Sequence, residues 1–115
     1  MEIIRKEVNE RMSRIVIHNN VVYLCGQVGD KEIPCVKKQA VVMLEKVEKL
    51  LFSAGSGKDK ILSATVYLKN MEDFDKFNTV WNAWLNPGCA PARACVQAAM
   101  SSEKYLVEIS VVAAV

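Results

Sequence analysis

The chain has few of the residues that interrupt or cross-link a fold. Among its 115 residues are five glycines, three prolines and one histidine, while hydrophobic residues make up 51%. This composition excludes collagen-like, low-complexity and disordered chains. The sequence also lacks a Gly-rich phosphate loop, a GxSxG elbow and an HExxH motif. The common nucleotide-binding, serine-hydrolase and zinc-protease sites are therefore excluded.

The chain also lacks a large excess of charge of either sign. Fifteen Lys and Arg against thirteen Asp and Glu give a formal net charge of +2, without the basic surplus that nucleic-acid-binding proteins concentrate on one face. No apolar run approaches the ~20 residues that span a bilayer, and no signal-peptide stretch opens the sequence. We predict one cytoplasmic domain, residues 1–115, that binds neither nucleic acid nor a membrane.

The cysteines do not form a metal-binding motif. Cys25, Cys35, Cys89 and Cys95 are irregularly spaced without a CxxC pair, and His18 is the one histidine that could join them. Structural zinc sites draw on closely paired ligands of these types, so we predict no metal. Thiols in a protein without a secretory signal mostly stay reduced, and we predict four free cysteines.

Six segments have the β-branched composition of strands. They span residues 2–5, 13–18, 21–26, 61–68, 92–98 and 105–115. Asn19-Asn20 separates the second from the third, and asparagine tolerates the positive φ angles of a type I′ turn. A hairpin with His18 opposite Val21 follows. In the fourth segment, Leu62, Ala64, Val66 and Leu68 are expected on one face.

Two segments show helical periodicity. Between Pro34 and Ala54, apolar residues recur at spacings of four, four, three and four, and Gly55 offers a left-handed stop. Pro34 suits the first turn. A second helix is predicted from the N-cap Asn70 to about Asn86. Its aromatic residues, expected to pack in the core, are Phe74, Phe77, Trp81 and Trp84.

The predicted order is βββαβαββ, an α+β fold with a six-stranded sheet and two helices on one face. The final strand is apolar on both sides, because Leu106 and Val112 alternate with Val107, Ile109 and Val111. The second sheet face would lack a cover. We therefore expect a homo-oligomer in which the bare sheet faces pack together.

Two charged residues interrupt the pattern of their strands. Arg93 lies between Ala92 and Ala94, small neighbours that leave its guanidinium accessible for bidentate contact with a carboxylate. Glu108 lies in an apolar strand, where a carboxylate has to be paired, hydrogen-bonded or beside a cavity. An ordinary exposed arginine, or a structural Arg93–Glu108 ion pair, explains the same pattern.

These residues resemble a known family. Pro91-x-Arg93-x-x-Val96, with Glu108 fifteen residues after the arginine, is similar to the signature of the RidA/YjgF family of reactive intermediate deaminases. Further similarity lies in Cys25-Gly26-Gln27, Gln39, Asp73-Phe74 and Asn78. Segments 16–20 and 105–108 resemble its YoaB-like branch, and the resemblance covers essentially the whole chain.

The resemblance implies a chorismate-mutase-like fold and a homotrimer with its sheets packed inside and ligand clefts between subunits. It also implies hydrolysis of 2-enamine and 2-imine acids to 2-keto acids and ammonia, without metal or organic cofactor. Arg93 would bind the substrate carboxylate and Glu108 would position the water. The backbone around Cys25 and Gly26, and that of Cys95, would border the ligand.

The sequence departs from the archetypal pattern near the first hairpin. Met12 stands where the family has a cleft tyrosine, and cannot donate that hydrogen bond. Cys25 replaces a serine, and Arg14 or Arg11 would favour a more anionic ligand. The alternative is therefore a non-catalytic or regulatory binder of small carboxylates on the same trimeric fold. RNA cleavage, sometimes attributed to the family, has weak support from a near-neutral chain with one histidine.

Overall fold

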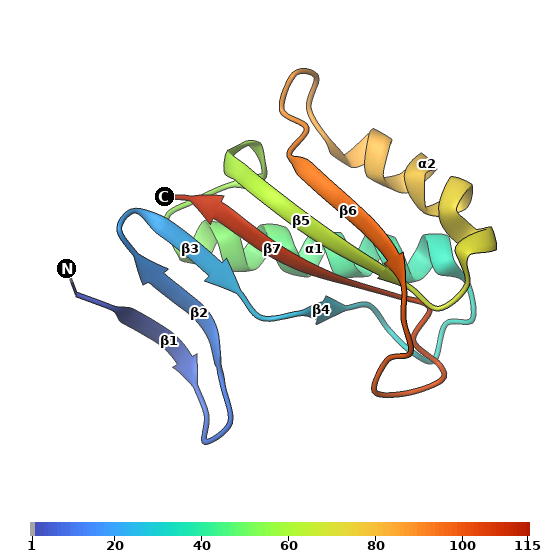
Figure 1. Ribbon diagram of the computed structural model, residues 1–115, viewed down its shortest axis with the longest axis horizontal. Coiled ribbons are helices and arrows are strands. Elements are labelled where there is room, and N and C mark those ends of the chain that lie inside the picture. The colour runs from blue at the N-terminus through green and yellow to red at the C-terminus, as the bar shows by residue number, and fades with distance from the viewer. Residues whose placement is uncertain (1) are drawn as a thin grey trace.

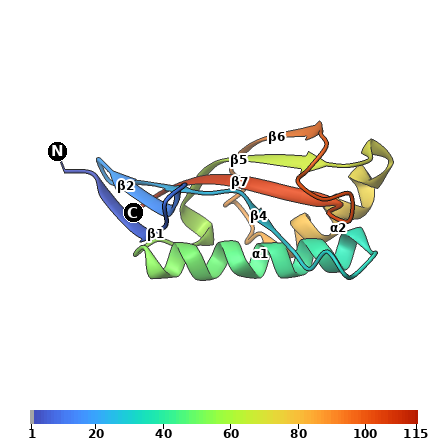
Figure 2. The same cartoon turned by 90° about the horizontal axis from the view of Figure 1, so that it is seen from below.

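A mixed sheet with both helices on one face organises the chain (Figures 1 and 2). The computed structural model describes residues 2–115. The strands are β1 (Ile4–Val8), β2 (Ser13–His18), β3 (Val21–Leu24), β4 (Gln27–Val28), β5 (Ile61–Leu68), β6 (Ala92–Gln97) and β7 (Val107–Ala114). The helices are α1 (Val36–Ser53) and α2 (Phe74–Trp84), with 3₁₀ turns at Lys58–Lys60 and Met71–Asp73. The predicted α+β class is confirmed.

The last strand lies at the centre of the sheet. The order is β1-β2-β3-β7-β5-β6, and β4 pairs with β7. Among the strands of residues 2–115, β5 and β6 are the one pair that runs parallel. The six predicted strands are present. The seventh strand, β4, was not predicted because it has only two residues, too few to show a strand pattern. The first strand begins and ends later than the predicted 2–5, because all five of its residues are exposed and no burial pattern marks it.

The hairpin between β2 and β3 follows the prediction. Asn19 and Asn20 have φ angles of 52° and 63°, and His18 pairs with Val21. Backbone pairing continues to Cys25, whose N–H donates to the Arg14 carbonyl at 3.0 Å. The local turn preference of the two asparagines therefore determines the register of the hairpin.

A bulge in β5 corrects the predicted face of Leu62. The register against β7 shifts between Ile61 and Ser63. Ile61 consequently takes the buried position, with 6% of its surface exposed, while Leu62 is 51% exposed. An extra residue in one strand reverses the faces of the side chains that precede it relative to those that follow it. A prediction based on strict alternation of faces does not include such a bulge.

Both helices start later than predicted. The N-cap of α1 is Cys35, so Pro34 precedes the helix instead of lying in its first turn. Gly55, with φ of 81°, does follow the helix as expected. Asn70 precedes the 3₁₀ turn, and α2 itself runs only from Phe74 to Trp84. Of residues 2–115, no helix is long and apolar enough to cross a membrane.

The two faces of β7 have different surroundings. Val107, Ile109 and Val111 are buried against the helices, whereas Glu108 and Val112 on the other face are half-buried. Figure 2 shows no helix over that second face. The bare sheet face predicted from the sequence is present.

Candidate functional site

Arg93 lies on the edge strand β6 and contacts α2. It pairs with Ala64 of β5, on the face that the helices cover. Its Nη1 donates a hydrogen bond of 2.8 Å to Asn78 Oδ1. Its Cζ atom lies 5.4 to 5.9 Å from the ring centres of three aromatic residues of α2, which are Phe74, Phe77 and Trp81.

These contacts fix the guanidinium. Aromatic faces attract a cation within about 6 Å, and arginine carries five N–H donors. The Asn78 bond uses one of them and leaves others for a ligand. The interpretation of Arg93 as an ordinary exposed residue is therefore wrong. Core packing of the aromatic residues is confirmed, since Phe77 and Trp81 are buried, but their second contact with Arg93 was missed.

Glu108 lies on the uncovered face of the sheet. It pairs with Tyr67 of β5 and Val28 of β4. A Cβ atom at Gly26 would overlap the Glu108 carboxylate, so the absence of a side chain there allows the close approach. Glu108 makes no ion pair with the residues in the described range 2–115. Gly26 and Glu108 are far apart in sequence but lie in direct proximity in the fold.

Arg93 and Glu108 do not meet within one subunit. They lie on opposite faces, and β5 separates β6 from β7. Neighbouring strands are about 4.8 Å apart, which puts these two strands roughly 10 Å from each other. The Arg93–Glu108 ion pair considered as an alternative therefore does not form within one subunit. Both residues can act on one small ligand only if different subunits supply them.

Four of the other predicted site residues come together near the segment that connects β3 to β4. Met12, Arg14, Cys25 and Gly26 line a hollow of about 370 Å³. The remaining lining residues are Gln27, Val28, Lys46, Lys49 and Leu50. The resemblance grouped the first four residues, while the lysines of α1 were missed because a contact across elements has no local sequence signal.

The thiols near these residues have different surroundings. Burial raises the pKa of Cys95, although the nearby charge of Arg93 opposes the shift. The Cys25 Sγ lies 3.2 Å from the Gln27 amide nitrogen, which donates to it. At the start of α1, by contrast, the backbone N–H of Lys38 lowers the pKa of Cys35. All four cysteines are free.

Gln39 ties the start of β7 to α1. It is fully buried, and its Nε2 donates to the Ile33 carbonyl at 2.8 Å and the Lys104 carbonyl at 2.9 Å. Its Oε1 accepts from the Leu106 N–H at 2.9 Å. Leu106 lies two residues before Glu108. The Gln39 side chain therefore anchors the backbone just before β7, two residues from Glu108.

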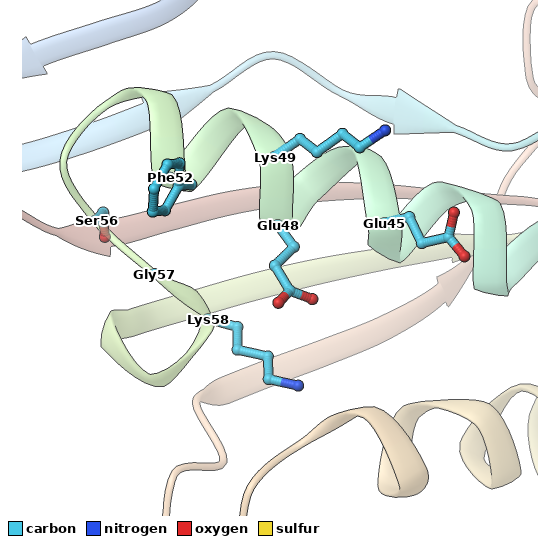
Figure 3. Close-up of a pocket in the computed structure, with 7 residues that line it drawn as sticks. All are labelled: Glu45, Glu48, Lys49, Phe52, Ser56, Gly57 and Lys58. Atoms are coloured by element: carbon cyan, nitrogen blue, oxygen red, sulfur yellow. The ribbon is translucent and has the colours of Figure 1, made fainter.

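Two further features lie apart from these residues. His18 is half-buried; the Asn19 Nδ2 atom lies 3.1 Å from its Nε2, and its Nδ1 has no partner within residues 2–115. A second hollow of about 510 Å³ lies between the end of α1 and the loop before β5 (Figure 3). It contains none of the predicted site residues.

Over the described chain, no three His, Cys, Asp or Glu residues gather as a metal site requires.

An open mixed sheet, two helices on one face, an edge arginine and a carboxylate on the bare face define a class of small α+β proteins. The family model described as Endoribonuclease L-PSP matches residues 5–115. The RutC family protein YoaB of Escherichia coli is 39% identical over 115 residues, covering 100% of both chains. The chain belongs to the RidA/YjgF family, and that prediction is confirmed.

Solved structures agree with this assignment. A YjgF protein family member from Neisseria meningitidis is 33% identical, with a TM-score of 0.95 over 99% of this chain and 95% of its own. An uncharacterized protein from Pseudomonas aeruginosa is 38% identical, with a TM-score of 0.93 over 98% of both chains. The fold and family are therefore established over almost the full length.

Proposed function

We propose that the protein hydrolyses reactive 2-enamine and 2-imine acids to 2-keto acids and ammonia in clefts between subunits. The observation that carries the proposal is the separation of Arg93 and Glu108 on opposite sheet faces. Asn78 and the rings of α2 hold Arg93, Glu108 lies against Gly26, and the two make no ion pair within residues 2–115 of one subunit. A cleft lined by two subunits would bring together a carboxylate-binding arginine and a carboxylate that can accept a proton.

Arg93 would hold the substrate carboxylate. Its guanidinium is fixed by Asn78 and the aromatic rings, so the remaining donors form a rigid fork for two parallel hydrogen bonds. Fixing the carboxylate also fixes the adjacent imine carbon. Such positioning can supply a large part of the rate enhancement.

Glu108 would act on the attacking water. As the water oxygen bonds to the electrophilic imine carbon, the carboxylate accepts a water proton and returns a proton to the nitrogen. Glu108 then transfers the hydroxyl proton of the resulting carbinolamine to its amine nitrogen, the C–N bond breaks as the keto group forms, and ammonia leaves. The reaction needs one proton-transferring group and no covalent nucleophile.

The assembly is the first prediction that follows. We expect a homotrimer, because the bare face around Glu108 and Val112 needs a cover and the family resemblance implies three subunits. Sedimentation equilibrium should give three times the chain mass of 12.8 kDa. A mass near that of one chain at micromolar concentration would contradict both the assembly and the inter-subunit cleft.

A coupled assay and calorimetry test the reaction and the role of Arg93. An amino acid oxidase or dehydratase that releases imines is mixed with the protein, and we expect faster keto-acid formation. Arg93→Ala should weaken 2-ketobutyrate binding roughly ten- to hundredfold, because a charge-assisted contact of about 1.5 to 3 kcal/mol is lost. Arg93→Lys should recover little, since an ammonium cannot form the planar fork.

Arg5→Ala is the matched control, because Arg5 lies exposed on β1. It should bind 2-ketobutyrate as the wild type does. Unchanged affinity in a folded Arg93→Ala variant would refute the carboxylate role, and melting curves establish that the variant is folded.

A non-catalytic or regulatory binder of small carboxylates is the alternative. The observation that favours it is Met12, which is 49% exposed beside the hollow and has no hydrogen-bond donor where the family has tyrosine. The coupled assay separates the two functions. Arg93-dependent binding without faster keto-acid formation would support the binder, whereas an increase in rate supports the hydrolase.

A further inference from the structure

The hollow beside the segment that connects β3 to β4 is lined by three cationic side chains. Arg14 comes from β2, and Lys46 and Lys49 come from α1. In the described residues, no Asp or Glu lines it. Figure 3 shows Lys49 projecting from α1 away from Glu48 and Lys58, toward the β3–β4 segment. The hollow therefore carries positive charge without a lining counter-charge.

We infer that this hollow binds a second carboxylate of the substrate, so that the preferred substrates derive from dicarboxylic amino acids. The inference rests on the proposed function. It adds a substrate class and a binding role for Lys49 and Lys46. A substrate with one carboxylate would leave these cations without an anionic ligand group, whereas a second carboxylate at its far end would pair with them.

The cations are available for such a ligand. The acidic group beside Arg14 is Glu7, at 3.9 Å, and both side chains are about half exposed, so that pair is weak. Lys46 donates one hydrogen bond of 2.9 Å to the Val28 carbonyl and has two further N–H donors. Lys49 makes no hydrogen bond or ion pair within residues 2–115.

The hollow shares one residue with the surroundings of Glu108. Gly26 lines it, and the same residue lies against the Glu108 carboxylate. A ligand whose reacting carbon lies near Glu108 could therefore extend past Gly26 into the hollow. Its volume of about 370 Å³ is ample for a carboxymethyl or carboxyethyl group.

Calorimetric titration of two keto acids tests the inference. The probes are 2-oxoglutarate, with two carboxylates, and 2-ketobutyrate, with one. We expect the wild type to bind 2-oxoglutarate about tenfold more tightly, equivalent to about 1.4 kcal/mol. Arg14→Met and Lys49→Met should each reduce that ratio. Lys38→Met removes the same charge from an exposed position of α1 outside the hollow, and should preserve the ratio.

The outcomes separate this inference from the proposed function. Equal affinities in the wild type, or a ratio that survives in both Arg14→Met and Lys49→Met, would overturn the second-carboxylate site and leave the deaminase proposal standing. If neither keto acid binds, the proposed function fails too. Salt should reduce the ratio, because exposed charge pairs are screened; a ratio that does not change with salt would also contradict the inference.

Discussion

Glu108→Gln is expected to lower the turnover of imine hydrolysis by about 10²- to 10⁴-fold, the usual contribution of a general base. Glutamine has nearly the same shape as glutamate, so it fits beside Gly26, but its amide cannot accept the water proton. The coupled keto-acid assay, run under saturating and limiting imine, should show the loss mainly in kcat.

Glu103→Gln supplies the control for this experiment. Glu103 is exposed in the segment that precedes β7, and the substitution removes the same charge. It should react at the wild-type rate. A Glu108→Gln variant with wild-type turnover would remove Glu108 from the reaction, while equal losses in both variants would point to a general effect of net charge.

Gln39→Leu is expected to destabilise the protein by about 3 kcal/mol or more. Leucine fills similar space but leaves the Ile33 and Lys104 carbonyls and the Leu106 N–H without their partner. Each buried unsatisfied group costs about 1 to 3 kcal/mol. Urea denaturation should show a lower midpoint with the same dependence on denaturant.

Gln97→Leu is the matched substitution at the surface. Gln97 is exposed, and its amide makes one hydrogen bond of 3.3 Å to the Lys69 carbonyl. The expected change is less than about 0.5 kcal/mol. Both variants are compared at one protein concentration, because an oligomer gains stability with concentration. Equal stability of Gln39→Leu and the wild type would show that Gln39 does not secure β7.

The role of Gln39 connects stability with the proposed chemistry. Its acceptor holds Leu106, and Glu108 follows on the same strand. Arg93 has an equivalent support in Asn78 and the rings of α2. Arg93 is thus held directly by groups of α2, whereas the contact from α1 is made to Leu106, two residues before Glu108.

The sequence alone determined features that depend on near neighbours. Asn19-Asn20 prescribed the hairpin, and the apolar spacing of α1 prescribed its buried stripe, because turn conformation and helical period act over a few residues. Arg93 and Glu108 were recognisable as exceptions to their surroundings, and the signature around them indicated the family.

Only the tertiary structure decided how distant segments meet. It placed β7 between β3 and β5, and the bulge beside Ile61 turned Leu62 outward. It also put Arg93 and Glu108 on opposite faces and Lys49 beside Arg14. Strand order and register result from long-range pairing and packing of whole faces. A local sequence pattern does not contain information about the energies of long-range strand pairing and packing. The sequence therefore identified the charged residues but not which of them could share a ligand.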